Sequence, residues 1–322
     1  MRAVVVMVVL FFAGFTLPCQ AASAGYRVFE FTYEMLAGEI PSSEVVDIYI
    51  PRPTDRIGQR ILNSQLRASL PVGRGWEARY HNGYYHLRRP ANINAPIELS
   101  FNWTVRRDDN AASQEQVLSS QEREKYLKAN TLVPVSHHIL DPILAEIRQL
   151  RKNPSKAATA RAIYDWIVDN IEYKKVGTGW GNGDTFWACN ERYGNCTDFH
   201  ALFISLARSE GIPARFEIGF PVPQGKSSGD IAGYHCWVQL FLPGQGWVPV
   251  DASEAAKHPE KRELYFGIHP PDRIHFSTGR DITFTEASKA LPLNYFIYPY
   301  MEVGGKPWNT KVQTRFHYKV ID

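Results

Sequence analysis

Apolar residues alternate with other residues along the first third of the chain. The alternation covers three segments, with apolar positions at Phe29, Phe31, Tyr33 and Met35, at Val46, Ile48 and Ile50, and at Ile97, Leu99, Phe101, Trp103 and Val105. A period of two with one apolar face is typical of a half-buried β-strand. Proline and glycine residues separate the segments, as expected for turns. The pattern predicts a small β-sandwich over residues 25–108, with a role in support or partner binding rather than catalysis.

From Asn110 the pattern becomes polar and helical. The stretches QEREKYLKAN and HHILDPILAEIRQL predict a helical connector over residues 109–150. A stronger helix is expected after Asn153-Pro154, because asparagine caps helices and proline suits the first turn. Its buried stripe is predicted to consist of Ala160, Ile163, Tyr164, Ile167, Val168 and Ile171. Residues 151–322 are then interpreted as a second domain that ends in further strands.

The stretch YGNCTDFHALF places a cysteine at the start of another helix. Apolar residues recur at helical spacing from Phe199 onward, and Gly211 and Pro213 end the helix. Cys196 lies three residues before Phe199, so its thiol begins the buried stripe. Unsatisfied amides and the helix dipole favour negative charge at this end, and the thiolate is the nucleophilic form of cysteine. Without a nearby base, a buried cysteine is usually only a small hydrophobic residue.

A histidine that could act as this base lies in YHCWVQLFLPGQGWVPVD. Two apolar segments flank a Pro-Gly-Gln-Gly turn, which indicates a β-hairpin. A turn centred near Pro243 and Gly244 places His235 opposite Asp251, where a carboxylate could hold the imidazole in one tautomer. The alternative is an ordinary cross-strand polar pair. Pro249 leaves the register open, since proline inside a strand implies an edge or a bulge.

Strand alternation also separates His235 from Cys236, which should face the other way with Val238 and Leu240. This weakens an alternative in which a zinc ion is bound by Cys196, His200, His235 and Cys236. It also leaves Cys236 free to form a disulfide with Cys189, which we state as a hypothesis.

The first residues resemble a secretory signal peptide. A short positive start precedes an uncharged run from Ala3 to Leu17, and Ala22-Ser23-Ala24 is typical of a cleavage site. The alternatives are an uncleaved anchor, for which the apolar run is short, and a lipid anchor at Cys19. We therefore expect residues 1–24 to be removed and the protein to be secreted or periplasmic. Three cysteines would remain, and an odd number leaves one thiol free.

Charge and glycine content exclude two classes of function. The formal net charge of +3 is too small to indicate a nucleic-acid binder, and it falls to +2 when Arg2 is removed with the signal peptide. The stretch GTGWGNGD lacks the lysine and hydroxyl residue of a phosphate-binding loop. It indicates instead a mobile loop, beside which Trp180, Phe186 and Trp187 could line a groove or simply belong to the core.

The order of cysteine, histidine and aspartate in YGNCTDFHALFISLARSEGIPARF, GYHCWVQLF and GWVPVDAS resembles the transglutaminase-like superfamily, in its secreted bacterial branch. The resemblance covers about residues 130–260. It implies an α+β fold in which helices pack on an antiparallel sheet, as in papain-like proteases. It would make Cys196 the nucleophile, His235 the general base and acid, and Asp251 the orienting carboxylate.

The chemistry implied by this resemblance is acyl transfer through a thioester, on a protein, peptide or peptidoglycan-like amide. The oxyanion would meet the Cys196 backbone N–H and a second donor, Asn190 or the Trp187 indole, with Trp180 in the cleft. Hydrolysis and transamidation both stay open. No EF-hand-like loop is present, so calcium is not carried over and no cofactor is expected. The competing interpretation is a catalytically silent binding or scaffold module.

Overall fold

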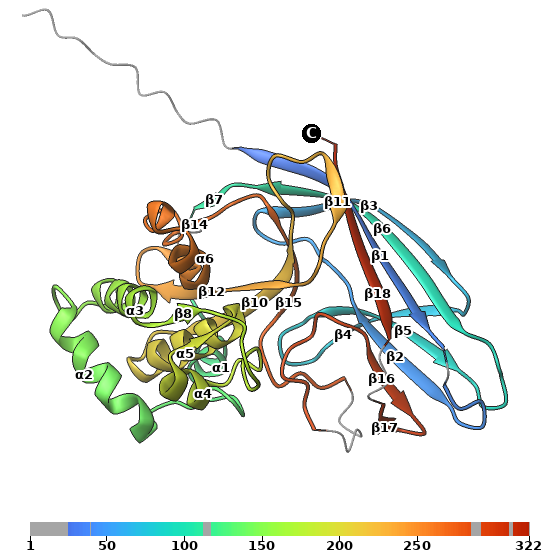
Figure 1. Ribbon diagram of the computed structural model, residues 1–322, viewed down its shortest axis with the longest axis horizontal. Helices are drawn as coiled ribbons and strands as arrows, with labels where there is room; N and C mark the ends of the chain where they lie inside the picture. The colour runs from blue at the N-terminus through green and yellow to red at the C-terminus, as the bar shows by residue number, and fades with distance from the viewer. Residues whose placement is uncertain (1–24, 39, 112–116, 285–290, 309–311, 322) are drawn as a thin grey trace, which may run out of the picture.

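The computed structural model describes residues 25–38, 40–111, 117–284, 291–308 and 312–321, and it has two lobes. Figure 1 shows a β-rich lobe on the right and a lobe with all the labelled helices on the left. This mixed α+β architecture confirms the predicted fold class. The expected signal peptide lies outside the described residues.

The β-rich lobe contains two five-stranded sheets. The first has the order β11-β18-β1-β6-β3 and the second has the order β17-β16-β2-β5-β4. The strands of the first are β11 (Ser228–Asp230), β18 (Gln313–Val320), β1 (Tyr26–Ala37), β6 (Ile97–Asp108) and β3 (Gln59–Ala68). Those of the second are β17 (Lys306–Pro307), β16 (Tyr300–Val303), β2 (Val46–Pro51), β5 (Gly83–Arg89) and β4 (Val72–Trp76). The alternation in β1, β2 and β6 is the predicted one, since their apolar positions are buried.

The C-terminal strands lie in this β-rich lobe. They were predicted to belong to the helical domain, but β18 pairs with β1, and β16 pairs with β2. The pairing buries Phe316 against the rings of Phe31 and Tyr33. The chain therefore leaves the first lobe after β6 and builds the helical lobe, from which β11 returns briefly to the first sheet, and it finally returns to complete both sheets of the β-rich lobe.

The helical lobe is built on a four-stranded antiparallel sheet with the order β13-β12-β10-β15. Its strands are β13 (Gly246–Val250), β12 (His235–Leu242), β10 (Ala214–Pro221) and β15 (Arg273–Thr278). The helices are α1 (Ser120–Leu127), α2 (Asp141–Leu150), α3 (Lys156–Asn170), α4 (Thr185–Glu191), α5 (Cys196–Ser209) and α6 (Ala252–Lys257). Short elements complete it: η1 (His138–Leu140), η2 (Pro259–Lys261), the pair β7 (Asn110–Ala111) and β14 (Ile268–His269), and the parallel pair β8 (Glu172–Tyr173) and β9 (Tyr193–Gly194).

Helix α5 lies at the centre of this lobe. Every residue from Cys196 to Arg208 is buried, including polar ones. The predicted stripe from Phe199 to Ala207 is fully inaccessible to solvent. The helix packs against β12 and β10 on one side and against α3, α4 and α6 on others. A helix that is buried all round holds its N-terminal residue in a fixed position.

The hairpin formed by β12 and β13 has a three-residue turn centred on Gly244, which has a positive φ of 74°. Val238 pairs with Val250, and Leu242 pairs with Gly246. This register differs by two residues from the one that would place His235 directly opposite Asp251. The two residues stay on one face, because a shift of two positions preserves strand alternation.

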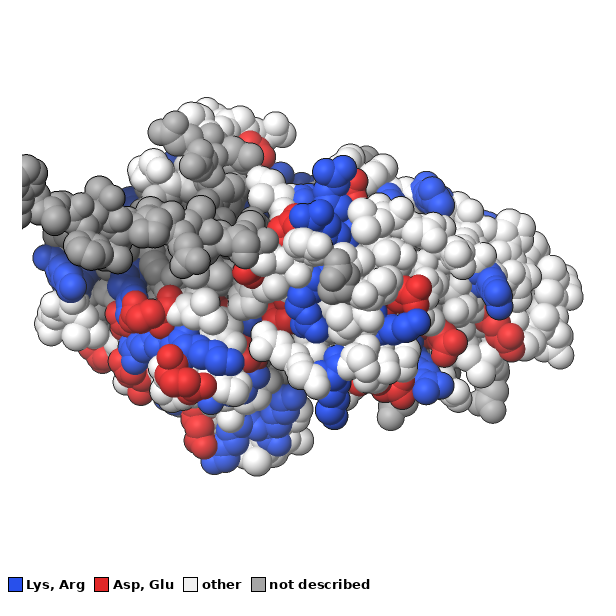
Figure 2. All heavy atoms as spheres, turned by 90° about the horizontal axis from the view of Figure 1, so that it is seen from above, with Lys and Arg blue, Asp and Glu red and all other residues white. Residues whose placement is uncertain are grey.

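Charged side chains are mixed over the surface. On the face drawn in Figure 2, lysines and arginines are interspersed with acidic residues across both lobes. This distribution fits the small net charge of +3. Among the residues that the structure describes, no helix has the length and apolar character needed to cross a membrane.

Candidate active site

Cys196 is the first residue of α5, as the sequence predicted. Asn195 caps the helix, and its side-chain oxygen accepts a hydrogen bond from the Thr197 N–H at 2.9 Å. The Cys196 side chain is 3% exposed. Only glycine fits at position 194, two residues before Cys196, since a Cβ there would lie 2.6 Å from the Asp198 Cβ. The local sequence therefore fixes both the start of the helix and the position of the thiol.

Asp198 connects this helix start to the glycine-rich loop. Its carboxylate accepts hydrogen bonds from the backbone N–H groups of Asn195, Gly181 and Gly183, at 2.7–2.9 Å. The carboxylate is buried and completes a capping box with Asn195. The loop is also held from the other side, where Tyr295 donates to the Gly181 carbonyl at 3.3 Å. The loop that the sequence suggested to be mobile is thus bonded to the helix beside the thiol.

His235 and Asp251 are in direct contact despite the shifted register. The His235 Nε2 lies 2.7 Å from the Asp251 Oδ2, and both side chains are buried. Asp251 follows β13 and caps α6, where its Oδ1 accepts hydrogen bonds from Ser253 and the Glu254 N–H. Arg273 of β15 forms an ion pair with the same carboxylate at 2.6 Å. The carboxylate is therefore fixed from several sides and presents one oxygen to the imidazole.

The thiol and the imidazole interact with each other as well. A hydrogen bond from Cys236 makes the largest contribution to a lowered pKa of Cys196; burial opposes it, and a hydrogen bond and charge from His235 lower the pKa further. Burial would lower the pKa of His235, but the Asp251 carboxylate outweighs this and raises it to about 9. These shifts favour a thiolate beside an imidazolium at neutral pH. Because Nε2 faces the carboxylate, Nδ1 is the nitrogen left for the sulfur.

Cys236 lies in the site, which corrects the sequence prediction. The alternation of β12 is as expected, but α5 covers the face that carries Cys236, so this thiol reaches Cys196. His235 is the first residue of the strand and approaches the same sulfur from the strand end. The proposed disulfide is absent from the structure, because Cys189, Cys196 and Cys236 are all free.

His200 also belongs to this network. Its Nδ1 lies 3.5 Å from the Cys236 sulfur, and its Nε2 lies 3.6 Å from the Asp251 Oδ1. Burial is the main cause that lowers the pKa of His200, to about 4, so the ring is neutral near pH 7. Asp251 therefore lies between one imidazolium and one neutral imidazole, and His235 is the ring that forms hydrogen bonds with both Cys196 and the carboxylate.

Two of the three residues predicted as oxyanion donors or cleft residues use their indole N–H groups in other hydrogen bonds. The Trp187 indole N–H donates to the Tyr193 carbonyl at 3.2 Å, and the Trp180 indole N–H donates to the Gly177 carbonyl at 3.2 Å. Asn190 is exposed near the end of α4. Trp187 and Trp180 therefore use their N–H groups in the loop, and neither indole is free to bind an oxyanion.

Three tyrosines lie near enough to the thiol to interact with its charge, and they were not predicted from the sequence. The charge of Cys196 contributes to raised pKa values of Tyr234, Tyr295 and Tyr298, after the larger effect of burial. The hydroxyl groups of Tyr234 and Tyr295 lie 3.3 Å apart. One signal was available in the sequence, since Tyr234 directly precedes His235. Tyr295 and Tyr298 come from a segment about 60 residues away, and no local pattern connects them to the site.

The zinc alternative has no geometric support. Across the described parts of the chain, no group of three or more His, Cys, Asp or Glu side chains is arranged to hold a metal ion. The donors pair with each other, His235 with Asp251 and His200 with Cys236.

Comparison with known proteins agrees with this geometry. Residues 143–252 match the family model of the transglutaminase-like superfamily, and this range contains Cys196, His235 and Asp251. These residues therefore resemble the transglutaminase-like superfamily. The match begins within α2 and ends at the start of α6, so the matched region covers the central helix and the β12–β13 hairpin.

Two bacterial relatives share parts of the sequence. A protein of Haemophilus influenzae is 30% identical over 232 residues, which is 62% of this chain and 62% of that protein. YebA of Bacillus subtilis is 31% identical over 77 residues, 21% of this chain and 10% of YebA. Both are uncharacterized. The matched region thus spans about three fifths of the first relative and a small part of the second.

A solved structure shares the fold over almost the whole chain. It is a candidate cysteine protease from Cytophaga hutchinsonii, with a TM-score of 0.60 and 18% sequence identity. The alignment covers 93% of this chain and 92% of that chain. That protein therefore shares the fold of both lobes.

Proposed function

We propose that the protein is a cysteine-dependent acyl-transfer enzyme that acts on amide or peptide bonds. In this proposal Cys196 is the nucleophile, His235 is the general base and acid, and Asp251 orients the imidazole. The supporting observation is the continuous contact from Asp251 through His235 to a thiol at a buried helix N-terminus. Cysteine, histidine and an orienting carboxylate in this order form the usual apparatus for covalent acyl transfer.

The reaction begins with a thiolate and an imidazolium. The Cys196 sulfur attacks the carbonyl carbon, and the C=O electron pair moves to the oxygen, near the first N–H groups of α5. His235 then gives its proton to the leaving nitrogen as the C–N bond breaks, which leaves a thioester. In the second half His235 removes a proton from water or from an amine, the new bond forms at the carbonyl carbon, and the thiolate leaves.

A peptide or protein amide is the proposed substrate class. The fold shared with a candidate cysteine protease favours it, whereas none of the comparisons supports a peptidoglycan-like amide. Water as the acceptor would give hydrolysis, and an amine would give transamidation. We further propose that the enzyme acts after export, because residues 1–24 have the pattern of a signal peptide. Cell fractionation would test this, and retention of residues 1–24 in a cytoplasmic protein would contradict it.

The chain contains its own control for the nucleophile. Cys189 is 8% exposed, close to the 3% of Cys196, but burial raises its pKa to about 11. At neutral pH we expect iodoacetamide to label Cys196 at least about 100-fold faster than Cys189, because only the thiolate reacts. Mass spectrometry of the digested protein locates both labels. His235→Ala should reduce the difference, because it removes a hydrogen bond and a positive charge that lower the pKa of Cys196.

A second measurement tests the covalent step itself. Wild-type protein is incubated with a mixture of peptides, quenched in acid, and analysed as intact protein for an added acyl mass. We expect an adduct on Cys196 that hydroxylamine removes, and no adduct with Cys196→Ala. Equal labelling of Cys196 and Cys189, together with no acyl adduct, would favour the silent scaffold instead.

A further inference from the structure

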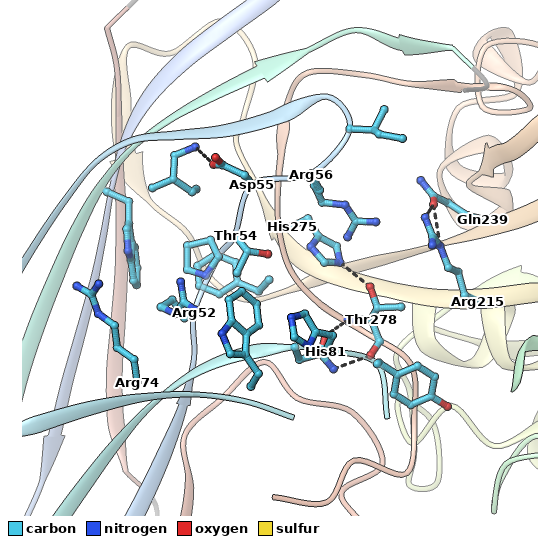
Figure 3. Close-up of a pocket in the computed structure, with 18 of the residues that line it drawn as sticks. Arg52, Thr54, Asp55, Arg56, Arg74, His81, Arg215, Gln239, His275 and Thr278 are labelled. Atoms are coloured by element: carbon cyan, nitrogen blue, oxygen red, sulfur yellow. Dashed lines mark hydrogen bonds between the residues drawn. The ribbon is translucent and has the colours of Figure 1, made fainter. Parts of the chain in front are cut away.

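A cavity of about 760 Å³ lies between the two lobes, away from the thiol. Its walls come from the segment after β2, from β3, β4 and β5, and from β10, β12, β13 and β15. Figure 3 shows Arg52 and Arg74 on one side of this space and Arg56, Arg215 and Gln239 on the other. The volume is in the range of small-molecule sites, which is about 300–1,000 Å³.

This cavity is separate from the catalytic residues. Gln239 lines it, and strand alternation places Gln239, Trp237 and His235 on one face of β12. Trp237 is 2% exposed and lies between the other two, with its ring 6.4 Å from that of His235 and 6.0 Å from that of His275. Four strand residues correspond to about 13 Å. A ligand in the cavity would therefore contact the sheet behind the site and not the thiol.

Positive charge dominates the walls. Four arginines line the cavity against one carboxylate, that of Asp55, which accepts a hydrogen bond from the Ile61 N–H. Arg56 and Arg215 are neutralised in part, because both form ion pairs with the buried Glu217. Within the described residues, Arg52 and Arg74 form no ion pair. The wall that holds these two arginines thus carries charge that the protein does not balance.

Arg52 is held in place by aromatic rings. Its guanidinium lies 4.6 Å from the centre of the Trp76 ring and 5.8 Å from that of Tyr85. Arg74 lies 5.7 Å from the same Tyr85 ring, so both cations pack against one side chain. The Arg52 Nε is buried without a hydrogen-bond partner. A half-buried cation without a counterion is costly, and a bound anion would supply one.

We propose that this cavity is a second ligand site, which binds a small anionic molecule through Arg52 and Arg74. The ligand carries a carboxylate or phosphate on an apolar or aromatic body. The guanidinium groups bind the acidic group, since their planar donors match both kinds of oxyanion. The Trp76 ring, which lines the cavity and is exposed, provides an apolar surface for the remainder. This proposal does not rest on the catalytic one.

Calorimetric titration with three matched probes tests the site. Phenyl phosphate and phenylacetate carry the two anionic groups, and phenylacetamide is the neutral control. We expect wild-type protein to bind at least one anion, at least about tenfold more tightly than the amide. The tighter of the two anions identifies the natural acidic group. Equal binding of the amide, or no binding of either anion at millimolar concentration, would refute the proposal.

Variants locate the binding. Arg52→Gln should weaken binding of the preferred anion at least about tenfold. Arg74→Gln should weaken binding less, because Arg74 is exposed. Arg60→Gln is the control, because Arg60 is exposed on β3 and does not line the cavity. Cys196→Ala should bind as the wild type does. If Arg60→Gln or Cys196→Ala lost as much affinity for the anion as Arg74→Gln does, the anion would bind elsewhere and the assignment would be contradicted.

Discussion

At the scale of single residues, Asp251 determines how strongly His235 holds its proton. The carboxylate lies 2.7 Å from the ring and raises the pKa of His235 to about 9. We expect the imidazole signal of His235 to titrate near pH 9 in NMR spectra of the labelled protein. Asp251→Asn should lower this midpoint by at least about one unit, because the amide carries no charge.

Glu254 provides a graded control for that titration. Its carboxylate is 3.9 Å from the His235 Nε2 and is partly exposed, so Glu254→Gln should shift the midpoint less than Asp251→Asn does. Above pH 9 the proton needed by the leaving amine is lost, and turnover should fall. A His235 midpoint near 6.5 in the wild-type protein would show that no such ion pair forms.

Cys236 has an effect of its own on the nucleophile. Its hydrogen bond is the largest contribution that lowers the pKa of Cys196, while burial keeps Cys236 itself protonated at neutral pH. Cys236→Ala should therefore raise the pKa of Cys196, and Cys236→Ser should preserve most of the effect, because serine retains a donor. The pH dependence of alkylation at Cys196 measures both variants. An unchanged profile in Cys236→Ala would show that His235 alone stabilises the thiolate.

At the scale of elements, Asp198 unites the start of α5 with the glycine-rich loop. Asp198→Ala would leave three N–H groups without an acceptor, and two of these, those of Gly183 and Asn195, are buried. We expect a loss of about 2–3 kcal/mol in unfolding free energy, from the cap and the unsatisfied donors together. Ser119→Ala removes the same capping box from the exposed α1 and should cost about 1 kcal/mol or less. Chemical denaturation of both variants measures this difference, and equal losses would contradict the role of the loop.

Elements with a strong local pattern could be predicted from the sequence. The stripe of α3 is buried at Ala160, Ile163, Tyr164 and Ile167, although the helix is capped by Ser155 rather than by Asn153. The α5 stripe and the position of Cys196 were also local properties, fixed by spacing and by the ending at Gly211. The register of the β12–β13 hairpin was less certain. Moving the centre of the turn by half a residue or by one residue changes the cross-strand partner of every residue.

At the scale of the whole molecule, contacts between residues far apart in the chain could not be predicted from local sequence patterns. Phe29 pairs with Val320, and nothing local distinguishes β18 from a strand of the second lobe. The same holds for Tyr295, whose position near Cys196 depends on the return of the chain between the lobes. Cys236 was misjudged for a related reason, since alternation gives the face of a strand but not what covers it.

Glu217 connects the two lobes through buried charge. It lies on β10 and forms ion pairs with Arg215 and with Arg56 of the β-rich lobe, and its side chain is fully buried. Glu217→Gln would leave these cations without a full counterion, and we expect a loss of about 3 kcal/mol in unfolding free energy. Asp230→Asn, in an exposed ion pair with Arg315, should change stability little.

The lowered pKa of Glu217 predicts how the effect of Glu217→Gln on stability changes with pH. Burial would raise the pKa of Glu217, but Arg56 and then His275 outweigh it and hold the pKa well below its usual 4.5. A carboxylate whose pKa is lower in the folded protein stabilises the fold fully at pH values above its pKa in the unfolded chain. That stabilisation is lost as the pH falls through its pKa in the folded protein. The stability gap between wild type and Glu217→Gln should therefore be constant above about pH 5 and shrink in acid. A gap that widens in acid would mean that folding raises the pKa of the carboxylate, and would contradict the proposed buried ion pairs of Glu217.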